Sequence, residues 1–106
     1  MLPKKKRLTA TEFSRFFASG RRVHGTNMQL VVTPLSEFHG AAVVGKKVFK
    51  SAVKRNKVRR RLYDALYRAY RRQSLTGVYI VIAKPAAAKA SFEALRDELE
   101  VLLGKV

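Results

Sequence analysis

Hydrophobic residues recur with a helical period in three segments of the chain. Residues 9–12 (TATE) form a capping box that opens the first segment, which ends near Ser19, before Gly20. The second segment runs from Val53 to about Arg72, and the third follows Ser91, an N-cap residue. Their apolar stripes are Phe13, Phe16 and Phe17; then Val58, Leu62, Ala65, Leu66 and Ala69; then Phe92, Leu95, Leu99, Leu102 and Leu103. The pattern predicts three helices.

Three shorter apolar segments have the length of β-strands. The first covers residues 28–33 (MQLVVT) and ends at Pro34, and a turn over residues 36–40 follows it. The second covers residues 41–44 (AAVV), with an extension toward Phe49. The third, residues 78–83 (VYIVIA), is apolar at every position, which is typical of a strand covered on both faces.

The order of these elements predicts the fold class. A strand, a helix and a strand follow one another between residues 41 and 83, which implies a parallel strand pair joined by the helix of residues 53–72. We therefore predict an α+β fold, a two-layer α/β sandwich with helices packed on the sheet. The general rule for such a crossover is right-handed.

Composition limits the class of protein. The chain has 106 residues, the size of one domain, and 47% of them are hydrophobic, which excludes a disordered basic tail. It contains no cysteine, which excludes disulfides and thiolate sites and fits a reducing compartment. The longest apolar run, residues 78–83, is too short to span a membrane, and no apolar segment follows the basic residues 1–7 as in a secretory signal. We expect a cytoplasmic protein.

The charge is large and unevenly distributed. The net charge is +16, from 23 Lys and Arg against 7 Asp and Glu. Residues 46–72 hold twelve cations and one acid, Asp64, whereas residues 91–100 hold four acids and one cation. Such separation favours a dedicated surface for a polyanion. Nucleic acid is the first expectation, and an anionic membrane is the alternative.

Candidate catalytic and metal-ligating residues are few. His24 and His39 lie fifteen residues apart, and the acids of the first ninety residues are Glu12, Glu37 and Asp64. A metal site needs clustered ligands, and a phosphate-cradling loop needs glycines at set spacings. Neither pattern occurs in the sequence, so we expect no catalytic residue, no metal site and no small-molecule substrate.

The basic helix of residues 53–72 has two different flanks beside its apolar stripe. A rotation of about 100° per residue places Asn56, Arg59, Arg60, Tyr63 and Tyr67 on one flank and Lys57, Arg61, Arg68 and Arg71 on the other. The cationic flank is suited to phosphates, and the mixed flank also to hydrogen bonds and stacking with bases. A solvated surface and a membrane-surface helix are the alternatives. The three phenylalanines of the first helix are either core residues or, for one or two of them, a stacking surface for single-stranded bases.

The central segment Gly45–Leu62 (GKKVFKSAVKRNKVRRRL) resembles the RNR signature of the bacterial ribonuclease P protein component. Its flanks are similar to that family in the same order. They are the basic start (PKKKRL), the aromatic first helix up to Gly20, the last strand with its ending (IVIAKP) and the closing helix. The resemblance therefore covers essentially the whole chain.

The resemblance implies both a fold and an activity. The fold is an αβββαβα sandwich with a mixed four-stranded sheet and a left-handed βαβ crossover, whose additional strand would come from residues 21–25. The protein would be a subunit of ribonuclease P, in which a catalytic RNA holds Mg²⁺ ions and cuts the 5′ leader from precursor tRNA. The protein would bind that RNA, hold the leader in a cleft between the first helix and the sheet, and promote cleavage at low Mg²⁺.

The resemblance also implies site residues. Carried over by position, the leader cleft contains Phe13, Phe17, Arg55, Asn56, Arg59 and Ala83. With the basic helix, it indicates RNA contacts at Lys46, Lys47, Lys50, Lys54, Arg55, Asn56, Lys57, Arg59, Arg60, Arg61 and Arg68. Three positions depart from the family pattern, since Lys57 and Tyr63 stand where arginine is common and Val31 stands where tyrosine is frequent.

Three other classes of protein share this basic composition. A structural RNA-binding protein, such as a ribosomal protein, would bind RNA without a part in its cleavage. An architectural DNA-binding protein would prefer duplex DNA. A stand-alone nuclease would cut without an RNA subunit, although no cluster of acids supports that class.

Overall fold

The computed structural model describes residues 3–106, and Met1 and Leu2 of the basic N-terminal stretch lie outside the described residues. Within that range the helices are α1 (Ala10–Ser19), α2 (Ala52–Gln73) and α3 (Phe92–Leu103). The strands are β1 (Arg21–His24), β2 (Met28–Thr33), β3 (Phe38–Val43) and β4 (Gly77–Ala83). Two short 3₁₀ turns, η1 (Lys4–Lys6) and η2 (Pro85–Lys89), precede α1 and α3.

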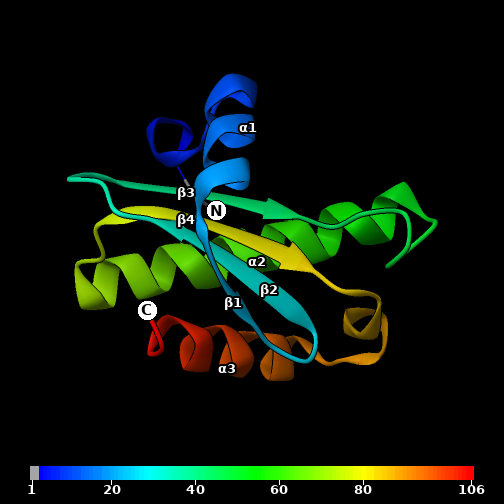
Figure 1. The fold of residues 1–106 in the computed structure, drawn as a ribbon. Coiled ribbons are helices and arrows are strands. Elements are labelled where there is room, and N and C mark those ends of the chain that lie inside the picture. Colours follow the sequence, from blue (N-terminus) through cyan, green and yellow to red (C-terminus); the bar gives the residue numbers. More distant parts are fainter. Residues whose placement is uncertain (1–2) are drawn as a thin grey trace.

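The strands form one mixed sheet in the order β1-β2-β4-β3. β3 and β4 are parallel, and the other neighbouring pairs are antiparallel. Figure 1 shows β4 below β3, both strands pointing the same way, and α2 returning behind them. This path makes the β3–α2–β4 crossover left-handed, contrary to the general rule and as the resemblance implied. The αβββαβα order is confirmed.

The two faces of the sheet pack on different helices (Figure 1). α2 and α3 cover one face and form the larger core with it. Their buried residues all belong to the predicted stripes, whereas Ala65 and Phe92 of those stripes are only half-buried against this core. The alternate residues of the strands, such as Leu30 and Val81, complete this core. α1 crosses the opposite face, where Phe16 joins a smaller core with Val31 and Ile80.

The start and the end of β3 both differ from the prediction. Residues 36–40 are not a turn, because β3 begins at Phe38 and pairs Gly40 with Tyr79 of β4. The strand then ends at Val43 instead of extending toward Phe49, because the amides of Val48 and Phe49 both donate to the carbonyl oxygen of Gly45 and form a turn. Pairing with β4 thus outweighs the weak strand preference of a Gly-containing segment.

Side chains cap each long helix at its N-terminus. The Thr9 hydroxyl accepts from the Glu12 amide, and the Glu12 carboxylate accepts from the Thr9 amide, which confirms the predicted capping box. Ser51 and Ser91 cap α2 and α3 in the same way. In residues 3–106, no helix is both long and apolar enough to cross a membrane.

Candidate nucleic-acid interface

The N-terminal half of α2 and the turn before it form a surface of exposed cations, here called the α2-start surface. Ser51 fixes the start of the helix by accepting from the Lys54 amide at 3.3 Å. No acidic residue lies between Glu37 and Asp64 in the sequence, so nothing in this segment neutralises its charge. The exposed members are the neutral Asn56 and the cations Lys46, Lys47, Lys50, Lys54, Lys57, Arg59, Arg60 and Arg61. The structure therefore brings most of the predicted RNA contacts to one end of the molecule.

Arg55 differs from these neighbours because it is half-buried. Its Nη1 donates to the carbonyl oxygens of Phe49 at 2.9 Å and Lys50 at 2.8 Å. A guanidinium has five N–H donors, so these bonds leave donors for a ligand. Through these two hydrogen bonds Arg55 links the helix to the preceding turn, residues 45–50, and fixes the position of the lysines on that turn.

Asn56 and Arg59 form a pair on the exposed side of α2. Nη2 of Arg59 donates to Oδ1 of Asn56 at 2.8 Å, one helical turn away. The carbonyl end of the Asn56 amide is therefore occupied, and its NH₂ group is left to donate. A donor amide beside a guanidinium is suited to phosphate oxygens or to acceptor atoms on bases.

The flank of α2 that faces α3 carries cations that already have partners. The Arg61 guanidinium lies 4.1 Å from the centroid of the Phe92 ring, and the Lys57 ammonium lies 5.9 Å from it. Arg68 lies 3.8 Å from Asp64, and Arg72 is paired with Glu100 of α3. The predicted purely cationic flank is therefore partly neutralised toward its C-terminal end, where the acids of α3 lie.

The three phenylalanines of α1 occupy different environments. Phe16 is 8% exposed and belongs to the core, whereas Phe17 is 36% exposed. Phe13 stacks on Phe17 with ring centroids 5.6 Å apart and an interplanar angle of 24°. The Arg22 guanidinium of β1 lies 4.7 Å from the Phe17 ring centroid and donates to the Phe17 carbonyl oxygen at 3.1 Å. We call these three residues the Phe–Arg stack. The sequence favoured a stacking role for the phenylalanines with arginines nearby, but Arg22 was not among the predicted site residues.

The strand residues beside α1 differ from the prediction at one position. Ala83 is 9% exposed and belongs to the core under α2 and α3, so it does not share a face of the sheet with Phe13 and Phe17. Residues alternate between faces along a strand, so Ile82 lies on the α1 side. Ile82 is half-buried and packs against the smaller core. Ile82, not Ala83, is therefore the β4 residue available to a cleft at α1.

Two of the three residues that depart from the family pattern, Val31 and Tyr63, are packed inside the fold. Val31 is buried where the end of α1 meets β2. A Cβ atom on Gly20 would overlap the Val31 side chain and lie 2.9 Å from the Phe16 carbonyl oxygen, so α1 approaches β2 closely only with glycine there. Tyr63 is half-buried and packs against the larger core instead of extending into solvent.

The predicted site residues thus fall into two groups on different sides of the sheet. Phe13 and Phe17 lie with α1 on one face, and Arg55, Asn56 and Arg59 lie on α2, which covers the other face (Figure 1). Within residues 3–106, no three His, Asp or Glu side chains gather into a group suited to a metal ion. His39 lies 3.9 Å from Glu37, and His24 lies at the end of the edge strand β1.

Comparison with known proteins gives a consistent result. The family model described as Ribonuclease P matches residues 2–106. The ribonuclease P protein component of Pseudanabaena sp. is 34% identical over 110 residues, covering 99% of this chain and 94% of that protein. The component of Nitratiruptor sp. is 32% identical over 98 residues, covering 92% and 88%.

Solved structures show the same fold. A Staphylococcus aureus RNase P protein, described as a mutant with defective mRNA degradation activity, superposes with a TM-score of 0.83 at 25% identity, covering 96% of this chain and 88% of that chain. The RNase P protein of Thermotoga maritima superposes with a TM-score of 0.77 at 21% identity, covering 94% and 96%.

Proposed function

The chain belongs to the ribonuclease P protein family, and on that premise we propose that it serves as the protein subunit of a ribonuclease P, the RNA-based endonuclease of tRNA 5′ processing. Its partner is an RNA, which agrees with the net charge of +16. One observation carries the assignment of surfaces: the α2-start surface presents exposed cations with no acid among them.

The α2-start surface is assigned to the catalytic RNA. Its cations project from a capped helix and from a turn that Arg55 fastens, so they are held in place before the RNA arrives. Positioned cations lower the repulsion between two RNA molecules, which reduces the Mg²⁺ needed for cleavage. The Mg²⁺ ions themselves are assigned to the RNA, and no cofactor is assigned to the protein.

The leader of precursor tRNA is assigned to the opposite face of the sheet. There the Phe–Arg stack supplies an exposed ring and a guanidinium, and Ile82 supplies an apolar surface. Rings stack on unpaired bases of any sequence, and arginine adds attraction to phosphate. Since mature tRNA lacks a leader, this face would favour precursor over product. We place the protein in the cytoplasm, together with its tRNA substrates.

Cleavage of precursor tRNA at low millimolar Mg²⁺ tests the proposal. A bacterial ribonuclease P RNA is assayed with this protein, without it, and with the protein alone. The proposal expects cleavage only when both are present. Activity of the protein alone would favour a nuclease. Tight RNA binding without any gain in cleavage would favour a structural RNA-binding protein, and a preference for duplex DNA would favour an architectural one.

A variant of the α2-start surface tests the assignment to the catalytic RNA. Lys54→Ala with Arg60→Ala removes two exposed cations whose side chains make no hydrogen bond, ion pair or ring contact within residues 3–106. Lys89→Ala with Lys105→Ala removes the same charge elsewhere. Affinity for the catalytic RNA should fall steeply for the first pair and little for the second, each measured at one fixed salt concentration because phosphate contacts are salt-dependent. Equal losses of affinity for the two pairs would show that RNA binding depends on the total charge of the protein and not on the position of the cations.

A further inference from the structure

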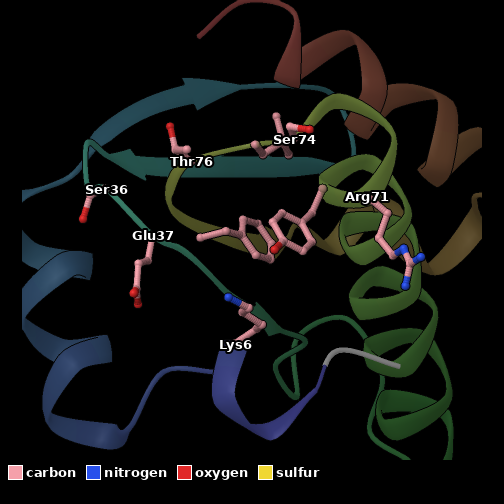
Figure 2. Close-up of a pocket in the computed structure, with 9 residues that line it drawn as sticks. Lys6, Ser36, Glu37, Arg71, Ser74 and Thr76 are labelled. Carbon is pink, nitrogen blue, oxygen red and sulfur yellow. The ribbon is translucent and has the colours of Figure 1, made fainter.

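A cavity of about 480 Å³ opens at the C-terminal end of α2 (Figure 2), at the opposite end of that helix from the α2-start surface. Three separate segments form its walls, with Lys6 from η1, Ser36 and Glu37 from the segment before β3, and Arg71 and Ser74 from the end of α2. Its volume lies within the range of small-ligand sites. We call it the α2-end pocket.

An aromatic row forms one side of this pocket. Tyr70 lines the pocket and stacks on Phe38, with ring centroids 4.3 Å apart and planes 12° apart. The Lys6 ammonium lies 5.6 Å from the Tyr70 ring centroid. Tyr67 extends the row 5.9 Å from Tyr70, and the Arg71 guanidinium lies over Tyr67 at 5.9 Å. Rings interleaved with cations are typical of surfaces that stack on single-stranded bases.

The rim of the pocket carries charges of both signs. Figure 2 shows Lys6 and Glu37 on the side of β3, whereas the Arg71 side chain points away from both of them. Lys6 attracts a phosphate, and a carboxylate such as that of Glu37 accepts only from N–H or O–H donors. The carbonyl groups at the end of α2 add a negative partial charge, which disfavours a bare anion. A nucleotide matches both signs, because it combines a phosphate with a base that has N–H donors.

The sequence independently connects this pocket with RNA. The mixed flank of α2, with Tyr67 beyond Arg59 and Arg60, begins at the α2-start surface and continues along the helix toward Tyr70. Tyr67 is half-buried and is not needed for either surface assigned above. An RNA strand that leaves the start of α2 along this flank would therefore reach the pocket at its other end.

We infer that the α2-end pocket binds one unstacked nucleotide of an RNA, with the base on Tyr70, the phosphate at Lys6, and a base N–H group at Glu37. The inference rests on the proposed function, since that function supplies the RNA. The nucleotide comes either from the catalytic RNA or from precursor tRNA. The pocket would recognise a nucleotide of either RNA through the same contacts, and the crosslinking experiment below distinguishes the two RNAs.

Site-specific crosslinking tests the pocket directly. Because the chain contains no cysteine, Ser36→Cys gives a single attachment point for a photoactivatable azidophenacyl group at the pocket rim. Val101→Cys, on the exposed side of α3, is the matched control. With catalytic RNA alone and then with precursor tRNA added, the Ser36 probe should mark a few adjacent unpaired nucleotides of one RNA, and the Val101 probe should mark none of them. The marked RNA identifies the source.

Affinity measurements complete the test. Lys6→Ala should weaken binding of the marked RNA by about tenfold, since a charge-assisted contact is lost. Lys5→Ala removes the same charge outside the pocket and should change binding by less than about threefold. Tyr70→Leu keeps apolar bulk against Phe38 and removes the stacking ring, and a thermal melt reports whether it folds. If Tyr70→Leu does not fold, the comparison of Lys6→Ala with Lys5→Ala decides the test.

The outcomes separate the two proposals. If the wild-type protein fails to activate the catalytic RNA, the proposed function fails. If it activates the RNA but the Ser36 probe marks no nucleotide, or marks only protein, the α2-end pocket is not a nucleotide site. Equal losses of affinity for Lys6→Ala and Lys5→Ala would likewise overturn the pocket while leaving the subunit function intact.

Discussion

The face of the sheet under α2 and α3 is closed, whereas the face under α1 is only partly covered. Leu30, Val81 and Leu66 on the closed side are fully buried. On the α1 side a smaller core surrounds Phe16, and Phe17 remains exposed beside it. The same strands supply both faces, so the difference comes from the number of helices packed on each. The closed face supplies most of the stability, and the open face leaves rings and cations available for a ligand.

Truncation of the closed core should give the largest effect. Leu66 is 0% exposed, and Leu66→Ala should lower the free energy of unfolding by about 2–5 kcal/mol, because it removes buried methyl groups and leaves a cavity. Urea denaturation measures the loss. Val101→Ala on the exposed side of α3 should change it by less than about 0.5 kcal/mol. Similar values for the two variants would remove the distinction between closed and open surfaces.

Truncation on the open face should affect binding more than stability. Phe17→Ala should lower the affinity of the holoenzyme for precursor tRNA by about tenfold or more, because a stacked base contributes about 1–3 kcal/mol. Mature tRNA, which has no leader, should bind as before. Equilibrium titrations with both tRNAs measure the ratio. Equal loss for both would show that Phe17 acts through the fold and not through the leader.

Replacing Arg22 of the Phe–Arg stack by lysine tests whether the open face binds its ligand through a specific arrangement or through charge alone. Arg22→Lys keeps the charge but loses the planar group over Phe17, so precursor affinity should fall by roughly two- to fivefold, the range of an exposed cation–π contact. Arg21→Lys is the matched control, since Arg21 is its neighbour on β1 and contacts no ring within residues 3–106; its Nη2 donates instead to the Lys105 carbonyl oxygen at 3.5 Å. A loss that is as large for Arg21→Lys would show that the stack contributes nothing specific.

The smallest effect concerns the cap that holds α1 on the open face. The Thr9 amide donates to the Glu12 carboxylate and lowers the pKa of Glu12 below its ordinary value of 4.5. A lowered folded pKa means that the stabilisation is complete well above pH 4.5 and is lost as the pH falls through the folded value. Glu12→Gln should therefore reduce the fall in melting temperature between pH 6 and pH 3, approximately the interval in which a glutamate titrates. An unchanged pH profile would show that the capping box does not stabilise the fold.

The helices were predictable because their signals are local. Thr9, Ser91 and the apolar stripes lie within a few residues of the backbone that they specify. β1 was not predictable from pattern, because residues 21–24 (RRVH) contain one apolar residue and form an edge strand that pairs only with β2. Only the family resemblance implied a strand there.

The candidate site was predictable in composition but not in arrangement. Exposed cations on α2 follow from the spacing of its apolar stripe, but β4 is apolar at every position, so its two faces look alike and Ala83 was assigned to the wrong side. The partners of Arg55, Arg61 and Arg22 lie on other elements or in turns, and no spacing reveals them. The α2-end pocket likewise unites segments far apart in sequence.

The pairing of the α2 cations with α3 also bears on how fast the protein meets its partner. Glu100 and its neighbours reduce the positive potential near the end of α2, while the start of the helix keeps its full charge. A protein whose positive charge is distributed so unevenly rotates in the electrostatic field of a polyanion before the two molecules make contact. Encounters would then occur with the start of α2 leading, which raises the association rate at low ionic strength more than it prolongs the complex.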